Sequence, residues 1–156
     1  MGQVRAEFTV YREAAFNNYV GFFQVADING GIDLNTDGTI DLRPGDAGYV
    51  EAAVRGRVPG IDLTVGNQAT ATFTATLSGD AIYAPFLIVN GRPEAVLDDN
   101  ANNNPEVYFA SPIANPGRFD HVRLLGNNTW GFEDLPLGGD RDFNDIILRG
   151  NFNSVA

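Results

Sequence analysis

Short stretches of alternating or continuous apolar residues, each bounded by turn residues, run along the whole chain. The clearest alternation is TATFTATL in residues 70–77, where every second side chain would point to the same face of a strand. Pro85 predicts a strand that is bulged or lies at the edge of a sheet. Runs rich in β-branched and aromatic residues predict further strands over residues 6–11, 16–26, 61–65, 81–89, 106–111, 119–125, 128–132 and 145–150.

Only one segment has the pattern of a helix. Residues 47–55 place Tyr49 and Ala53 on one face, Asp46 is positioned to cap the first turn, and Gly56 follows the last turn. Nine or ten short strands with one short helix are typical of an all-β domain. We therefore predict a jelly-roll-like β-sandwich.

The composition fits one domain of this class. A chain of 156 residues can bury a single hydrophobic core, so residues 1–156 are interpreted as one domain. The formal net charge of −10 argues against nucleic acid and anionic membranes as partners, because both attract basic surfaces. The absence of cysteine excludes disulfides and thiolate chemistry. The chain also lacks a signal-peptide pattern, and we expect the domain to be excised from a larger protein.

The stretch WGFEDLPLGGDRDFNDII in residues 130–147 is dense in acidic side chains. Carboxylates this close repel one another unless they extend into solvent or share a cation. If residues 140–144 form a strand, Asp140, Asp142 and Asn144 point to one face. Arg141 and Phe143 then point to the other face. The pair Gly138-Gly139 lets the backbone fold back toward the preceding carboxylates. The candidate metal ligands are Glu133, Asp134, Asp140, Asp142, Asn144 and Asp145.

This set of oxygen donors indicates calcium, which takes roughly 6–8 hard oxygen ligands in flexible geometry. Magnesium prefers stricter octahedral sites that keep several waters, and zinc prefers His or Cys. The alternative interpretation is a solvated acidic loop. The apolar residues interleaved with the carboxylates and the regular D-x-D-x-N-D spacing favour the metal site.

A second acidic segment, Asp33-x-Asn35-x-Asp37-Gly38, copies the opening of an EF-hand loop. The copy fails at its twelfth position, which is Pro44 rather than Glu, and no helix pattern precedes it. Asp and Asn followed by Gly also describe an ordinary hairpin turn, which is the preferred interpretation. A second metal site at Asp33, Asn35 and Asp37 stays an alternative.

Four other side chains are candidate ligand contacts. His121, the single histidine, is either a ligand contact, an acid/base group, or a residue bonded to its neighbours beside the acidic stretch. Trp130, the single tryptophan, is either a stacking platform for a sugar or part of the core, and Asn127 and Asn128 lie just before it. No serine lies in a nucleophile-elbow pattern, and we assign no catalytic residue.

Residues 107–148 resemble a bacterial family known as domain of unknown function 4114. The signature residues are FED at 132–134, GGD at 138–140 and DFND at 142–145. PGDAGYVEAA and APFLIVNG, further upstream, are also similar to the family pattern. Members of the family occur in large secreted and cell-surface proteins of cyanobacteria and marine bacteria, many of which resemble repeats-in-toxin adhesins. The resemblance implies a calcium-stabilised β-sandwich module of a larger extracellular protein.

Three functions are compatible with these observations. The first is a non-enzymatic, calcium-dependent ligand-binding module of a secreted or cell-surface adhesin, whose ligand is a carbohydrate or a peptide end. The second is a spacer domain that calcium only stabilises, between neighbouring domains of the larger protein. The third is a hydrolase acting on polysaccharide, which would need two carboxyl groups roughly 5–10 Å apart in a cleft.

Overall fold

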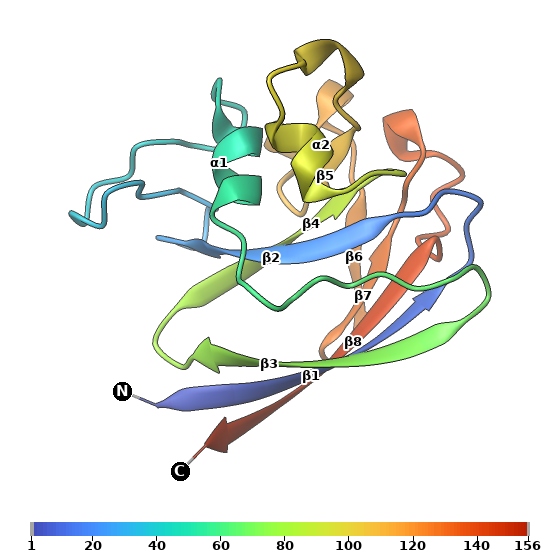
Figure 1. Cartoon of the computed structure of the whole chain (residues 1–156), viewed down its shortest axis with the longest axis horizontal. Coiled ribbons are helices and arrows are strands. Elements are labelled where there is room, and N and C mark those ends of the chain that lie inside the picture. Colours follow the sequence, from blue (N-terminus) through green and yellow to red (C-terminus); the bar gives the residue numbers. More distant parts are fainter. Residues whose placement is uncertain (1, 156) are drawn as a thin grey trace.

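The computed structural model describes residues 2–155, which form two antiparallel β-sheets packed face to face (Figure 1). The strands in chain order are β1 (Gln3–Arg12), β2 (Tyr19–Val25), β3 (Thr70–Ser78), β4 (Ile82–Ile88), β5 (Val107–Phe109), β6 (Val122–Gly126), β7 (Thr129–Phe132) and β8 (Ile146–Val155). One sheet has five strands in the order β3-β1-β8-β7-β6, and the other has three in the order β2-β4-β5. The predicted β-sandwich is confirmed, with eight strands in the described chain rather than nine or ten.

The five-stranded sheet is built on β1 and β8, which pair along their whole lengths from Gln3↔Val155 to Arg12↔Ile146. Alternate side chains of β1 face the core, and Phe8 among them is fully buried. This period of two is the pattern of a strand with one wet and one dry face. Figure 1 shows the two chain ends lying near each other at one end of this pair.

The three-stranded sheet is buried on both faces. In β2, YVGFFQV, only Gln24 is exposed. The outer face of this sheet is covered by helices α1 (Tyr49–Arg55) and α2 (Pro93–Leu97), as Figure 1 shows. Burial on both faces explains why this strand has a nearly continuous apolar run instead of an alternation. No helix within residues 2–155 has the length and hydropathy required to cross a membrane.

The molecule has three layers: the larger sheet, the smaller sheet and the two helices. A hydrophobic cluster fills the space between each pair of neighbouring layers. The first lies between the two sheets, where Phe8 stacks on Phe22 with ring centroids 5.2 Å apart. The second lies between the smaller sheet and the helices, where Tyr49 of α1 packs on Phe109 with ring centroids 5.3 Å apart. The smaller sheet is therefore held rigidly from both sides.

The structure lacks one predicted strand and contains one helix that was not predicted. Residues 61–65 form no strand, because Leu63 makes only an isolated bridge to Val20. The short helix α2 was not predicted, although Pro93 in its first turn is a helix-start signal, since the missing N–H is not needed there.

Two predictions about single residues are also wrong. The N-cap of α1 is Gly48 with a φ of 86°, and the carboxylate of Asp46 instead accepts a hydrogen bond from Arg43 N at 2.7 Å. Pro85 lies in the central strand of its sheet rather than at an edge or a bulge. Only residues Phe86–Ile88 of β4 pair with β5, so the missing N–H of Pro85 removes no bond to that strand.

Two loops are tied together at the end of the sandwich where β7 passes to β8. The connection from β1 to β2 contributes Asn18, whose side chain is fully buried. Asn18 Nδ2 donates to Asp134 Oδ2 at 2.7 Å, and Asn18 Oδ1 accepts from Asn90 N at 3.0 Å. Glu13 N donates to Asp145 O at 3.1 Å. The loop that carries the predicted acidic site is therefore anchored to the sandwich.

Replacing Phe8 by alanine tests the packing of the two sheets. Phe8 is fully buried and stacks on Phe22, so we expect Phe8→Ala to lower the free energy of unfolding by about 3–5 kcal/mol, measured by chemical denaturation. Thr74→Ala, at an exposed position of β3, should change it by less than about 1 kcal/mol. Equal effects of the two substitutions would contradict this description of the core.

Candidate metal site

The acidic loop connects two neighbouring strands of the larger sheet. Beyond the end of β7, Glu133 N still donates to His121 O at 2.9 Å. The chain then leaves the sheet, reverses at Gly138 and Gly139, whose φ angles are 84° and 48°, and enters β8 at Ile146. The predicted reversal at the two glycines is confirmed, and it returns the loop to Glu133.

Residues 140–144 do not form a strand, so the alternation that a strand would give does not apply to them. Arg141 and Phe143 have positive φ angles of 61° and 54°, which no strand contains. Asp140 Oδ1 accepts a hydrogen bond from Asp142 N, and Asp142 Oδ1 accepts one from Asn144 N, both at 3.3 Å. The spacing of two residues therefore comes from successive turns capped by acidic side chains, because Asp stabilises turns by bonding to the backbone two residues ahead.

Glu133 is common to both clusters of acidic side chains that the loop forms. Its carboxylate lies with those of Asp140 and Asp142 in one group, and with those of Asp134 and Asp145 in another. Within each group, one oxygen of every residue lies within 4.8 Å of the others. All five predicted carboxylates are thus brought together, and Asn144 lies in the same loop, where its N–H bonds to Asp142.

The two carboxylates that follow β7 are buried, whereas the two that follow the glycines are exposed. Glu133 is 0 % exposed and Asp134 is 3 % exposed. Glu133 Oε2 accepts a hydrogen bond from Arg141 N at 3.1 Å, but the buried Oε1 atom has no hydrogen-bond partner among the described residues. Burying an ionised oxygen without a hydrogen-bond donor costs free energy. This atom therefore needs a partner that the described residues do not supply.

Burial and crowding change the acidity of the cluster. Burial raises the pKa of Glu133, and it raises the pKa values of Asp134 and Asp145 from 3.8 to about 6. The hydrogen bond from Asn18 and the nearby Arg12 lower the pKa of Asp134, but they do not offset burial and the charge of Asp145. Near neutral pH the cluster holds several negative charges in a poorly solvated place.

The residues fit a hard divalent cation. Every converging side chain offers oxygen, and neither His nor Cys belongs to the two groups. The unpartnered Glu133 Oε1 lies beside Gly139, where an added Cβ would overlap it. A cation at this position would satisfy the orphaned oxygen and offset the repulsion among the carboxylates.

His121 lies in the core beside this loop. It is fully buried, its ring stacks on Tyr108 with centroids 3.5 Å apart, and its Nδ1 lies 2.9 Å from Glu133 O. A carbonyl oxygen only accepts, so Nδ1 carries a proton, and burial lowers the histidine pKa. His121 therefore supports the strand end that bears Glu133, which is the structural alternative to a ligand contact.

Trp130 and Asn128 line a separate cavity of about 270 Å³ between the sheets, whose other walls include Phe22 and Phe152. The Trp130 ring meets Phe22 edge-on with centroids 6.2 Å apart, so it packs against the core while one side faces this cavity. Asn127 is exposed in the turn between β6 and β7, at the opposite end of β7 from Glu133. These candidate ligand contacts do not join the acidic cluster.

The segment around Asp33 forms a loop that a single bridge between Ile32 and Leu42 closes. Asp33 accepts hydrogen bonds from the backbone N–H groups of Asn35, Asp37 and Gly38 at 2.8–3.3 Å. The preferred turn interpretation agrees with these bonds. Asp33, Asn35 and Asp37 belong to neither acidic group around Glu133, and the second metal site stays a prediction.

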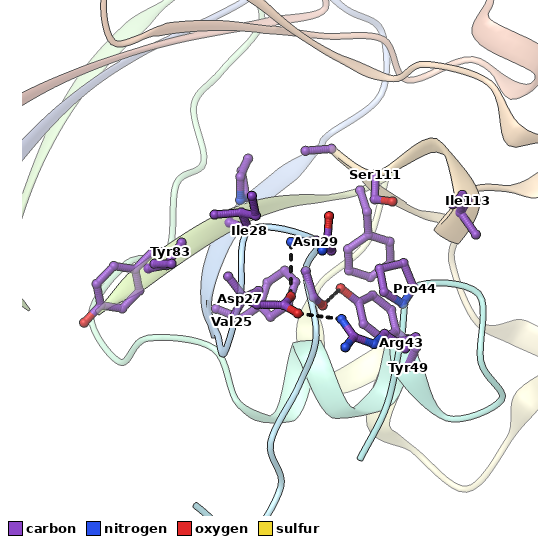
Figure 2. Close-up of a pocket in the computed structure, with 17 residues that line it drawn as sticks. Val25, Asp27, Ile28, Asn29, Arg43, Pro44, Tyr49, Tyr83, Ser111 and Ile113 are labelled. Atoms are coloured by element: carbon purple, nitrogen blue, oxygen red, sulfur yellow. Dashed lines mark hydrogen bonds and ion pairs between the residues drawn. The ribbon is translucent and has the colours of Figure 1, made fainter. Parts of the chain in front are cut away.

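A larger cavity, of about 590 Å³, lies at the other end of β2 (Figure 2). Its polar groups bond to one another: Arg43 Nη1 lies 2.6 Å from Asp27 Oδ2, and Tyr49 OH donates to Gly30 O at 2.6 Å. None of the site residues predicted from the sequence lines this cavity. Its charges are already paired, so it offers a mostly apolar surface rather than a reactive site.

Residues 77–153 match the family model described as Domain of unknown function (DUF4114). This part of the chain belongs to the DUF4114 family. The matched residues run from the end of β3 into β8 and include the whole acidic loop, so the resemblance seen in the signature residues is confirmed. Neither the curated proteins nor the solved structures contain a significant match.

Two residues beside the acidic cluster, both outside the part that matches DUF4114, carried no recognisable sequence signal. Asn18 lies 116 positions from the Asp134 carboxylate to which it donates, and Arg12, which lowers the pKa of Asp134, lies still further from it in the sequence. The central position of Glu133 depends on where β7 ends, which the spacing of the carboxylates does not indicate. Only the strand pairing brings these groups together.

Replacing Gly139 tests the close approach of the loop to Glu133. Gly139 has φ 48° and ψ −137°, a conformation that side chains disfavour, and its Cβ would overlap Glu133 Oε1. We expect Gly139→Ala to lower the free energy of unfolding by about 1–3 kcal/mol and to weaken calcium binding, both measured by titration. Gly126→Ala is the control, because no atom lies within 4 Å of its Cβ position. Wild-type calcium affinity in Gly139→Ala would contradict the assigned geometry.

The raised pKa values predict how the stability of the metal-free protein depends on pH. Asp134 and Asp145 have pKa values of about 6 in the folded chain against 3.8 ordinarily, so the folded state binds more protons than the unfolded state between these values. The free energy of unfolding should therefore fall as the pH rises from about 4 to about 6. Asp27 and Asp37, whose pKa values are lowered, titrate below this window.

Denaturation of the metal-free protein at several pH values measures this effect. Asp145→Asn should reduce the slope, because it removes one of the groups whose pKa is raised in the folded chain. A stability that rises steadily through the same pH window in the wild type, with no change of slope in the variant, would refute the assignment.

Proposed function

We propose that this DUF4114 chain is a non-enzymatic, calcium-dependent ligand-binding module of a larger secreted or cell-surface bacterial protein. In this proposal calcium occupies the acidic cluster at the end of β7 and orders the loops around it. The ligand is a carbohydrate or a peptide end on a cell surface, and neighbouring domains of an adhesin carry the module. The resemblance to family members in such proteins supports this setting.

The observation that carries the proposal is the orphaned oxygen of Glu133. Glu133 Oε1 is buried, lacks a donor, and lies in a group with the carboxylates of Asp140 and Asp142. A buried carboxylate normally pairs with a basic side chain or accepts several N–H bonds. Glu133 instead faces further carboxylates, and a divalent cation is the partner that compensates all of them at once.

The donor set favours calcium among the common divalent ions. The connection between β7 and β8 offers carboxylate oxygens from both of its ends, which suits the roughly 6–8 ligands and variable geometry of calcium. These carboxylates belong to Glu133, Asp134, Asp140, Asp142 and Asp145. Magnesium holds its waters more tightly and prefers octahedral geometry, and zinc prefers nitrogen or sulfur. The metal would be bound by residues from both the strand end and the turns.

The distribution of exposure supports a ligand-accessible side. Asp140 and Asp142 are exposed, while Glu133 and Asp134 are buried. An ion between these two sets would rest on the core and face solvent through the outer carboxylates. A bound cation at such a position supplies local positive charge to an acidic protein and can attract a ligand hydroxyl or carboxylate.

A purely structural role for calcium is the second candidate, and the anchoring of the cluster favours it. Asp134 binds the buried side chain of Asn18 at 2.7 Å, and Asp145 Oδ2 accepts from Asp134 N at 2.7 Å. These bonds link the metal ligands to the connection between β1 and β2. An ion bound there would hold two loops to the sandwich even if no ligand followed.

Thermal unfolding with calcium tests the proposal. Because calcium would bind the folded chain only, a concentration of 100 times Kd should add about 2.7 kcal/mol of stability. For a domain of this size that corresponds to a rise in Tm of roughly 5–10 °C. Magnesium at the same concentration should produce a smaller rise. Sugars and short peptides added with calcium should raise Tm further if the module binds them, and a calcium shift without any such response would favour the structural role.

Glu133→Gln gives a sharper test because it should act in opposite directions with and without metal. Without calcium, the substitution removes a buried carboxyl group whose pKa is raised by burial. The variant should therefore have a higher free energy of unfolding than the wild type near neutral pH. With calcium, most of the rise in Tm should be lost. Glu7→Gln, at an exposed position of β1, is the control and should change neither value. A full calcium shift in Glu133→Gln would contradict the proposed site.

A further inference from the structure

Beside the acidic loop lies a small cavity of about 180 Å³ that is lined by three arginines, Arg118, Arg123 and Arg141. Two aromatic side chains, Phe119 and Phe143, complete most of its wall. The arginines come from different segments, namely the turn before β6, β6 itself and the acidic loop. None of the predicted site residues accounts for this feature.

The charge of this cavity is opposite to that of the chain. The protein has a formal net charge of −10 and ten basic residues in all, yet three of them line this one cavity. Asp120 is the single acidic side chain in the lining, and its only ion pair there, with Arg123 Nη2, is 3.9 Å long and largely exposed. Such a pair contributes little, so the arginine charge in this cavity is mostly uncompensated.

Aromatic rings hold two of the guanidinium groups in place. Arg123 Cζ lies 4.1 Å from the ring centroid of Phe143, which is 2 % exposed, and Arg141 Cζ lies 5.8 Å from that of Phe119. A cation–π contact attracts a guanidinium to the ring face and uses none of its N–H donors. Within residues 2–155, the ion pair with Asp120 is the one that Arg123 makes, and Arg118 and Arg141 make none.

We propose that this cavity, the arginine pocket, binds an oxyanion of the ligand, either a carboxylate or a sulfate of an acidic sugar. Arginine binds both groups through paired N–H donors, and its planar fork matches their geometry better than a lysine ammonium would. The volume is sufficient for such a group. The ligand class that follows is an acidic saccharide, whose remaining atoms would extend over the exposed side of the acidic loop.

The arginine pocket and the metal site share one segment of chain. Arg141 lies between Asp140 and Asp142, its backbone N–H donates to Glu133 Oε2 at 3.1 Å, and Phe143 follows in the same loop. Without a cation, the neighbouring carboxylates oppose an incoming anion. Calcium would offset that charge and fix the loop, so anion binding should be stronger in the calcium-bound protein, and by reciprocity the anion should strengthen calcium binding. This inference rests on the proposed calcium site.

The test is an NMR titration of the ¹⁵N-labelled chain with sodium sulfate and with glucuronate, in metal-free and calcium-saturated samples. Metal is removed by dialysis, so that no anionic chelator remains to compete for the arginines. Sodium chloride at equal ionic strength and glucose serve as controls for screening and for the neutral sugar. We expect saturable shifts at residues 118–123 and 138–143 with sulfate, glucuronate or both, and a lower Kd with calcium. The two probes distinguish a sulfate from a carboxylate ligand.

Arg118→Gln and Arg123→Gln should each weaken anion binding by about tenfold, the equivalent of roughly 1.4 kcal/mol. Both side chains are exposed, so these variants should fold normally. Arg149→Gln, at an exposed position of β8 away from the cavity lining, is the matched control and should bind as the wild type does. Equal weakening in all three variants would overturn the inference, because it would indicate a general charge effect.

The outcomes separate the arginine pocket from the metal site. If calcium binds and neither anion produces local shifts, the arginine pocket is refuted while the calcium site stands. If an anion binds the arginines equally with and without calcium, the inferred coupling is refuted. If calcium does not bind at all, the proposed function fails, and the metal-free titration alone decides whether the arginines hold an anion.

Discussion

The end of the sandwich that carries the acidic loop is organised by one carboxylate that the protein does not neutralise. Glu133 is fully buried at the end of β7, where one of its oxygens accepts a backbone N–H and the other has no partner among the described residues. Removing a carboxylate from water without a compensating charge costs several kcal/mol. The side chains that the loop groups around Glu133 are carboxylates, and in the proposed function a cation supplied from outside offsets their charge.

The rest of the fold makes this arrangement possible. The smaller sheet is buried between the larger sheet and two helices, which leaves little freedom at the strand ends. Asn18, at the entry to β2, ties Asp134 to the turn after β4 through two hydrogen bonds. The loop itself needs two glycines at its reversal, because Gly139 lies where any side chain would collide with Glu133. The packed layers thus position a loop whose carboxylates repel one another.

The sequence predicted the features that depend on local pattern. Alternation over residues 70–77 matches β3, and the dense carboxylates of residues 133–145 do converge. Predictions from the sequence were wrong where contacts between distant segments determine the local structure. Leu63 is buried as a strand residue would be but finds only one bridge, and Pro85 is tolerated in a central strand because β5 ends before reaching it. The contact of Asn18 with Asp134 and the arginine pocket could not be predicted, because the fold brings together residues that lie apart in the sequence.

The most direct measurement is a crystal structure from a calcium-containing solution, with anomalous data collected at long wavelength. The account predicts an anomalous peak roughly 2.3–2.6 Å from Glu133 Oε1, with further oxygen ligands from the acidic loop. A map without a peak there, in which Glu133 Oε1 instead bonds to a water molecule or another protein group, would contradict the central claim.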